Sequence, residues 1–191
     1  MLYLSRPSAE AIGEFIASQK DQEFSYADVG ATRRQSPKGY TVDHNRVQLG
    51  QGSDDFARAK AAIGNWRMFE VAGLTLCYPD TPIAAGATVA LLASHFGVWS
   101  LNACRIVYVV EEHGGVERYG FAYGTLPEHG VIGEERFSVE YHTADQSVWY
   151  DLFAFSRPTL LAALAYPFAR TLQRRFASDS KRAMQLALRN G

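Results

Sequence analysis

Three charged residues, Arg105, Glu135 and Asp151, fall within runs in which alternate residues are apolar. Side chains two positions apart along a strand share a face, so each charge shares its face with aliphatic or aromatic side chains. By this alternation the neighbours are Leu101, Ala103, Val107 and Val109 for Arg105, Phe137, Val139 and Tyr141 for Glu135, and Trp149, Phe153 and Phe155 for Asp151. A buried charge without a partner is too costly to retain, so each needs an ion pair, a ligand or an opening to water.

Two interpretations of these charges stay open from the sequence. In the first, Arg105 forms a buried ion pair with Glu135 or Asp151 that fixes the strand register. In the second, Arg105 recognises an anionic or carbonyl group of a ligand, and Glu135 acts as an acid or base with a raised pKa. The residues that we expect to line such a cavity are Arg105, Tyr119, Tyr123, Glu135, Tyr141, Trp149 and Asp151.

The same alternation assigns the remaining side chains of these runs. Opposite Glu135 lie Glu134, Arg136, Ser138 and Glu140, and we expect that polar face to be exposed to solvent. In the run 118–126 the aromatic residues share one face, and Gly120, Ala122 and Gly124 leave the other face almost bare.

Other reactive residue types do not form a recognisable site. The five histidines have no His-Glu-x-x-His or zinc-type spacing, and the isolated Cys77 and Cys104 are expected to be buried and reduced. No Gly-x-Ser-x-Gly motif supports a serine nucleophile. Gly50-Gln-Gly52 lacks the remaining residues of a phosphate-binding loop and predicts a turn before a helix capped by Ser53. We therefore expect no metal and no cofactor.

The elements that must position these residues follow from periodicity. Helical spacing predicts helices over 8–18 and 54–66 and a long amphipathic helix that opens at Pro158, with a kink at Pro167. Short extended segments are expected at 26–29 and 46–49. Six longer runs predict strands separated by tight turns: 71–78, 87–96, 100–112, 118–126, 134–142 and 147–155. The expected fold class is α+β, with a curved antiparallel sheet of about six to seven strands wrapped on the C-terminal helix.

Length and composition predict a single domain over 1–191. No apolar run is long enough to span a membrane and no signal peptide is evident, so we expect a cytoplasmic protein. Residues 157–191 hold seven basic residues and one acidic residue, +6, which leaves −7 for residues 1–156 of a chain with net charge −1. This asymmetry indicates either a basic helix packed on an acidic body or a helix that meets a membrane surface. Nucleic acid is not expected, since no stacking motif accompanies the basic residues.

Several motifs together resemble a known family. They include Tyr26-x-x-Val-Gly-Ala-Thr32, Leu49-Gly-x-Gly52, Trp66-x-x-Phe69, Cys104-Arg-Ile-Val107, Gly120-Phe-Ala-Tyr-Gly-Thr-Leu-Pro127 with His129, Gly133-Glu-Glu-Arg-Phe137 and Ser156-Arg-Pro158. Over nearly its whole length the chain resembles a bacterial and plant family known only as a domain of unknown function, although the usual Pro-Gly-His is Pro127-Glu-His129 here. That family in turn is similar to the START-like, birch-pollen-allergen superfamily. The resemblance implies a helix-grip fold that often encloses a lipid-like ligand, and it implies no established reaction.

These observations favour a protein that binds a small hydrophobic or amphipathic molecule between the sheet and the C-terminal helix. Two alternatives remain. One is an enzyme of cyclase, isomerase or hydrolase type that uses Glu135 with Arg105. The other is a peripheral membrane or protein-interaction module that acts through Arg170, Arg174 and Lys181 of the basic helix.

Overall fold

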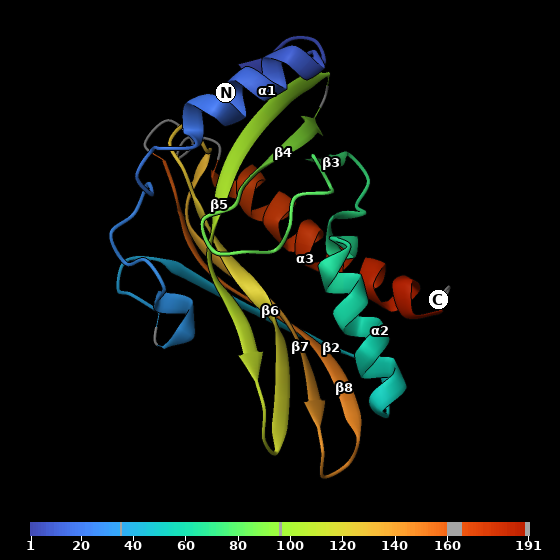
Figure 1. The fold of residues 1–191 in the computed structure, drawn as a ribbon. Helices are drawn as coiled ribbons and strands as arrows, with labels where there is room; N and C mark the ends of the chain where they lie inside the picture. Colours follow the sequence, from blue (N-terminus) through green and yellow to red (C-terminus); the bar gives the residue numbers. More distant parts are fainter. Residues whose placement is uncertain (35, 96, 160–165, 190–191) are drawn as a thin grey trace.

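A computed structural model of the protein describes residues 1–34, 36–95, 97–159 and 166–189. Its centre is one antiparallel sheet of eight strands in the order β2-β8-β7-β6-β5-β4-β3, with β1 paired to β5 (Figure 1). The strands are β1 (Leu2–Tyr3), β2 (Thr41–Gln51), β3 (Leu74–Cys77), β4 (Thr88–His95), β5 (Val98–Glu112), β6 (Val116–Thr125), β7 (Val131–His142) and β8 (Ser147–Pro158). Consecutive strands from β3 to β8 pair as hairpins, which confirms the meander that the short turns predict.

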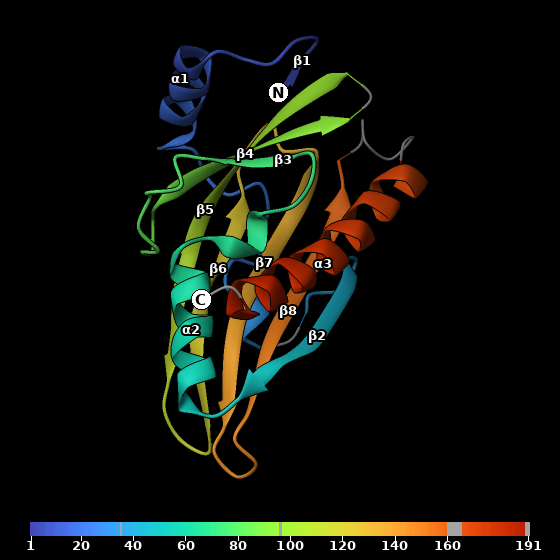
Figure 2. The same cartoon turned by 90° about the vertical axis from the view of Figure 1, so that its right-hand side faces the viewer.

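Helices cover both faces of this sheet. They are α1 (Ala9–Gln19), α2 (Ser53–Gly64) and α3 (Tyr166–Arg189), with short 3-10 helices η1 (Ala31–Arg33) and η2 (Arg67–Phe69). Figure 2 shows α3 crossing the sheet obliquely with α2 on the same side, and α1 lying at one end of the molecule. We call the sheet face toward α2, η2 and α3 the inner face, and the opposite one the outer face. The predicted fold class, an antiparallel sheet wrapped on a long C-terminal helix, is confirmed.

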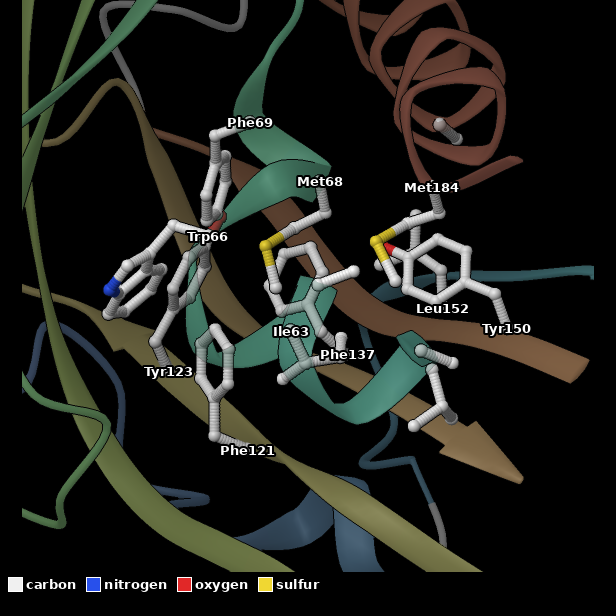
Figure 3. Close-up of a cluster of buried hydrophobic side chains, with 14 of the residues drawn as sticks. Ile63, Trp66, Met68, Phe69, Phe121, Tyr123, Phe137, Tyr150, Leu152 and Met184 are labelled. Atoms are coloured by element: carbon white, nitrogen blue, oxygen red, sulfur yellow. The ribbon is translucent and has the colours of Figure 1, made fainter. Parts of the chain in front are cut away.

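The main core lies between the inner face and the covering helices. Phe137 of β7 is fully buried at its centre, and its ring centroid lies 5.1–5.3 Å from those of Phe69, Phe121 and Tyr123 (Figure 3). These contacts are within the range of favourable aromatic pairs. Because Phe69 belongs to η2 and the other three rings to β6 and β7, the cluster joins the sheet to the segment that follows α2.

A second, smaller core lies on the outer face near the N-terminus. Phe15 of α1 packs with Leu101 and Ala103 of β5 and with Leu126, all of them buried. The side chain of Ser8 caps α1 by accepting a hydrogen bond from the backbone N–H of Ala11 at 3.2 Å, as the sequence predicts.

Three local predictions differ from the structure. The prediction that a helix begins at Pro158 is wrong, because β8 continues to this residue. Proline is tolerated here because it is the last residue of the strand and need not donate a further hydrogen bond to the sheet. Ser53 does not cap α2; it is the first helical residue and follows Gly52, whose φ of 88° suits glycine. No strand forms at 26–29, whereas the short segment 46–49 belongs to the eleven-residue β2. The early helical positions Leu160, Leu161 and Leu164 lie outside the described residues. Pro167 lies in the first turn of α3, and the kink expected there depends on the residues before Tyr166, which are not described.

Replacing Phe137 by alanine should lower the free energy of unfolding by about 3–5 kcal/mol, because it removes buried aromatic surface and leaves a cavity in the main core. Urea denaturation followed by circular dichroism measures the effect. Leu4→Ala is the control, since Leu4 is 91% exposed and its loss should change stability by less than about 0.5 kcal/mol. Equal stability of the two variants would contradict the assigned core.

Candidate functional site

A pocket of about 950 Å³ lies between the inner face and α3. Its wall is formed by strands β2 to β8, the segment 71–73, the turn 129–131 and α3 from Leu172 to Asp179. Leu91, Leu152 and Phe176 supply apolar surface, and a few polar side chains reach the same space. This composition, mostly apolar walls with sparse polar groups, is typical of small-molecule sites.

Glu135 and Tyr123 form a polar pair in the pocket wall. They are register partners on β7 and β6, so their side chains emerge side by side on the inner face. The Tyr123 hydroxyl donates a hydrogen bond to the Glu135 carboxylate at 3.0 Å. Burial raises the pKa of Glu135 to about 7, and the negative charge of Asp43 adds to this rise while the Tyr123 hydrogen bond opposes it. Burial also raises the pKa of Tyr123 well above its ordinary value, so its hydroxyl remains a donor.

A second polar group closes the pocket on the β2 side. The register Asp43–Ala154–Glu135 across β2, β8 and β7 brings Asp43 onto the same face as Glu135. Arg170 of α3 binds the Asp43 carboxylate through both terminal nitrogens, at 2.5 and 2.7 Å. Gln173 accepts from Arg170 at 2.7 Å and donates to Ser156 Oγ at 3.2 Å. This bidentate pair ties α3 to the edge strand and neutralises Asp43.

Two more of the predicted cavity residues lie on the inner face, but in the packed core. Tyr141 stacks on Phe56 of α2 with ring centroids 5.5 Å apart, and Tyr119 is half-buried against the same cluster. They belong to the part of the inner face that α2 covers. The structure therefore brings together Tyr123 and Glu135 of the predicted set, and it places Tyr119 and Tyr141 outside the pocket wall.

Arg105 lies on the outer face, so the expectation that it faces Glu135 or a ligand in this pocket is wrong. Its guanidinium donates to the backbone carbonyls of Gln19, Lys20 and Gln22 at 2.6–2.9 Å. A cation suits this position because the free carbonyls at the end of α1 carry partial negative charge. The apolar row of Arg105 does exist, but it packs against α1, and an irregularity between Ile106 and Tyr108 interrupts the alternation beyond it.

Trp149 and Asp151 are also on the outer face, which corrects their predicted place in the cavity. Asp151 is buried and accepts hydrogen bonds from Arg136 at 2.9 Å, and His44 Nε2 lies 2.5 Å from its other oxygen. The guanidinium of Arg46 lies over the Trp149 ring, 4.5 Å from its centroid. The alternation groups these residues correctly, but it cannot say which face the helices cover.

Glu134, predicted to be exposed to solvent, is 2% exposed. Its carboxylate accepts hydrogen bonds from the Tyr26 hydroxyl at 2.6 Å, the Gly30 N–H at 2.7 Å, the Thr32 N–H at 3.0 Å and the Thr32 hydroxyl. The segment 26–32 thus packs over the outer face and shields this carboxylate from water. Gly124 beside it makes the approach possible, since a Cβ there would lie 2.1 Å from the Tyr26 hydroxyl oxygen.

The rest of the outer face carries a charged hollow of about 770 Å³. Its buried carboxylates already have cationic partners: Asp151 has Arg136, and Glu140 has Arg46 and Arg118. Burial acts to raise the pKa of Glu140, but hydrogen bonds from Arg118 and His142 prevail and lower it. This network pairs the buried carboxylates, although Nε of Arg136 is buried without a hydrogen-bond partner among the described residues, and the more apolar wall of the inner pocket makes that pocket the stronger candidate site for a small molecule.

Several pocket residues were not singled out in the sequence. Asp43 and Gln173 lie in segments whose pairing only the fold reveals. His129 lines the pocket beside Gly130, and its Nδ1 accepts the backbone N–H of Val131 at 3.0 Å, while burial lowers its pKa to about 4. The sequence marks His129 only as part of the glycine- and aromatic-rich motif, and its place in the pocket wall follows from the fold.

Within the described ranges no cluster of three or more His, Cys, Asp or Glu side chains could hold a metal ion. Cys77 and Cys104 are both buried and unpaired with each other, and burial raises the pKa of each thiol. Among the helices of the described part of the chain, none has the length and apolar character needed to cross a membrane.

Comparisons with known proteins place the chain in a family. The profile described as "Domain of unknown function (DUF1990)" matches residues 25–183. A UPF0548 protein of Dictyostelium discoideum is 31% identical over 207 residues, covering 98% of this chain and 96% of that protein. A UPF0548 protein of Deinococcus radiodurans is 38% identical over 196 residues, covering 96% and 97%.

Solved structures of helix-grip proteins are also similar to this chain. The structure of Ara h 8.0201 is 9% identical with a TM-score of 0.49 and covers 80% of this chain and 100% of that one. Norcoclaurine synthase from Thalictrum flavum in complex with dopamine and hydroxybenzaldehyde is 10% identical with a TM-score of 0.44 and covers 82% and 96%. This similarity concerns the fold alone.

Replacing Glu134 by alanine should release the segment 26–32 from the outer face. The change leaves the Tyr26 hydroxyl and two backbone N–H groups without their acceptor, at a cost of at least about 3 kcal/mol in unfolding free energy. Hydrogen exchange followed by mass spectrometry should show faster exchange in that segment. Glu10→Ala, at an exposed position in α1, is the matched control, and unchanged protection of 26–32 in Glu134→Ala would contradict the assignment.

The raised pKa of Glu135 predicts a pH-dependent stability. Between the ordinary value of 4.5 and about 7 the folded protein holds a proton on Glu135 that the unfolded chain releases, so the contribution of Glu135 to stability falls as pH rises. Relative to the unaltered chain, Glu135→Gln should therefore gain on the order of 2 kcal/mol between about pH 5 and about pH 8. Denaturation series on both proteins measure the difference, and parallel pH profiles would show that Glu135 titrates normally.

Proposed function

The chain belongs to the DUF1990 family of unknown function, and we propose that it binds a small amphipathic molecule between the sheet and α3. The observation that carries this proposal is the pocket of about 950 Å³ on the inner face. Ligand sites in proteins commonly occupy about 300–1,000 Å³, with apolar walls and a few polar groups that orient the ligand. The Glu135–Tyr123 pair supplies such polar groups here.

The location of the pocket fits a binding role. It lies between the inner face and α3 and borders the aromatic cluster around Phe137, with which it shares Tyr123 and Phe176. The buried, reduced state of Cys77 and Cys104 fits the cytoplasmic location that the sequence predicts for such a protein.

A catalytic use of the same pocket is a second candidate, because a carboxyl group with a pKa of about 7 is suited to exchange protons near neutral pH. Tyr123 is then the group that orients the Glu135 carboxyl. Arg105 has no part in this version, since its guanidinium is bound to the end of α1 on the outer face.

The basic helix α3 gives less support to a membrane-surface role. Arg170 binds Asp43, and Lys181 donates to Asn45 Oδ1 at 3.2 Å, both on β2. Arg175 forms an ion pair along the helix with Asp179 at 3.5 Å. Two of the three cations that the sequence assigned to a membrane-facing surface thus bind the body of the protein, and Arg174 remains exposed.

The neutral fluorescent probe N-phenyl-1-naphthylamine should bind with an increase in emission, and Ala154→Phe should weaken this binding at least about tenfold. Ala154 lies beside Glu135 in the pocket wall, so a phenyl ring there occupies the space of the probe. Ala57→Phe, which adds the same ring at an exposed position of α2, is the control. Equal affinity of the two variants would contradict the pocket as the binding site. If the probe binds in the pocket, mass spectrometry of small molecules that co-purify with the folded protein would identify the natural ligand.

A further inference from the structure

Most polar side chains that reach the pocket already have partners within the protein. Asp43, Arg170, Gln173 and Ser156 bind one another. On the far side, Asn102 donates to Ser100 Oγ at 3.1 Å, and Thr125 Oγ1 donates to the Gly133 carbonyl at 3.2 Å. His129 accepts from Val131. These groups need no ligand to satisfy their hydrogen-bonding capacity.

Glu135 is different. A carboxylate offers about four acceptor positions, and within the described residues Glu135 uses one of them, for the Tyr123 hydroxyl. No arginine, lysine or histidine of the described chain forms an ion pair with it. Its side chain is half-buried and lines the pocket, so the remaining acceptor positions are accessible to whatever occupies that space.

The charges around Glu135 limit what can approach it. Asp43 is neutralised by Arg170, yet its negative charge still acts on Glu135 and disfavours the ionised form. A ligand with a carboxylate or phosphate beside Glu135 would bring a second negative charge to the ionised carboxylate in a poorly solvated space. A ligand with a hydrogen-bond donor, and above all one with a positive charge, removes the cost of burying the Glu135 carboxylate.

We propose that the molecule bound in this pocket carries a protonated amine at its polar end, held by the carboxylate of Glu135. This inference rests on the proposed function and narrows it to a class of ligand, an amphipathic amine. The Tyr123 hydroxyl keeps the carboxylate oriented, and Phe176 on the α3 side adds apolar surface to the wall for the rest of the ligand.

The other ionisable side chains around the pocket are paired within the protein, exposed or directed to the outer face. The pKa of His129 is lowered to about 4, so its ring is neutral at pH 6 and above. The imidazole of His44 lies on the outer face beside Asp151, although its backbone reaches the pocket wall. On α3, Arg170 is paired with Asp43 and Arg175 with Asp179, and Arg174 is exposed.

Calorimetric titration with three probes of equal tail length, n-octylamine, 1-octanol and octanoate, tests the inference. Octylamine should bind at least about tenfold more tightly than the other two at pH 8. Its affinity should rise about tenfold from pH 6 to pH 8, because a carboxyl with a pKa of about 7 goes from roughly 10% to roughly 90% ionised while the amine stays protonated. Glu135→Gln should abolish both the preference and the pH dependence, and Glu10→Gln, an exposed carboxylate in α1, should change neither.

The outcomes separate this inference from the proposed function. If octanol or octanoate binds as tightly as octylamine, or if octylamine affinity does not rise with pH, the amine assignment is wrong while binding in the pocket stands. Octylamine binding that Ala154→Phe does not weaken lies elsewhere on the protein and also overturns the assignment. If no octyl probe binds while N-phenyl-1-naphthylamine does, the amine assignment fails and the proposed function stands; if that probe does not bind either, both fail. Should Glu135→Gln not fold, the pH series on the unaltered chain decides the question.

Discussion

The pleat of β7 places two neighbouring carboxyl groups, Glu134 and Glu135, on opposite faces of the sheet, and the arrangement of both faces depends on how each group is accommodated. Neither can be buried alone without a large cost. Glu134 is satisfied by donors of the segment 26–32, which thereby covers the outer face. Glu135 receives one donor from the protein and faces a pocket. One carboxylate thus organises structure, and its neighbour is left available to a ligand.

The glycine- and aromatic-rich motif of β6 contributes aromatic side chains to the inner face and glycines to the outer face. Its aromatic residues Phe121 and Tyr123 both point inward to the main core, and Tyr123 also lines the pocket. On the other side, Gly124 leaves room for the Tyr26 ring, and Gly120 is required because a Cβ there would lie 2.0 Å from the Phe137 carbonyl oxygen. The motif is therefore explained largely by packing, and its contribution to the pocket wall comes from Tyr123 and Thr125.

Edge strand β2 and helix α3 complete the pocket through electrostatics. Arg170 of the basic C-terminal segment pairs with Asp43 of the acidic part of the chain, and Lys181 donates a hydrogen bond to the neutral side chain of Asn45. These contacts fix α3 against the inner face, where Phe176 of the helix also packs on the aromatic core. Part of the charge asymmetry of the chain is thus used for contacts within the protein. The pocket for which we propose a ligand lies between the sheet and the helix that these contacts hold in place.

Periodicity and turn residues in the sequence were sufficient for the strands from β3 to β8, the helices α1 and α2, and the fold class, because these depend on local spacing and on hairpins between neighbours. The alternation also grouped Glu135 with Tyr141 and Asp151 with Trp149 correctly. It could not say on which face of the sheet each helix or loop packs. Such contacts can join residues about a hundred positions apart in the sequence, as Thr32 and Glu134 show. For that reason Arg105, Trp149 and Asp151 were assigned to the pocket and Glu134 to solvent. A strand pattern determines which side chains share a face, and only the tertiary structure decides whether that face meets a helix, a loop, a ligand or water.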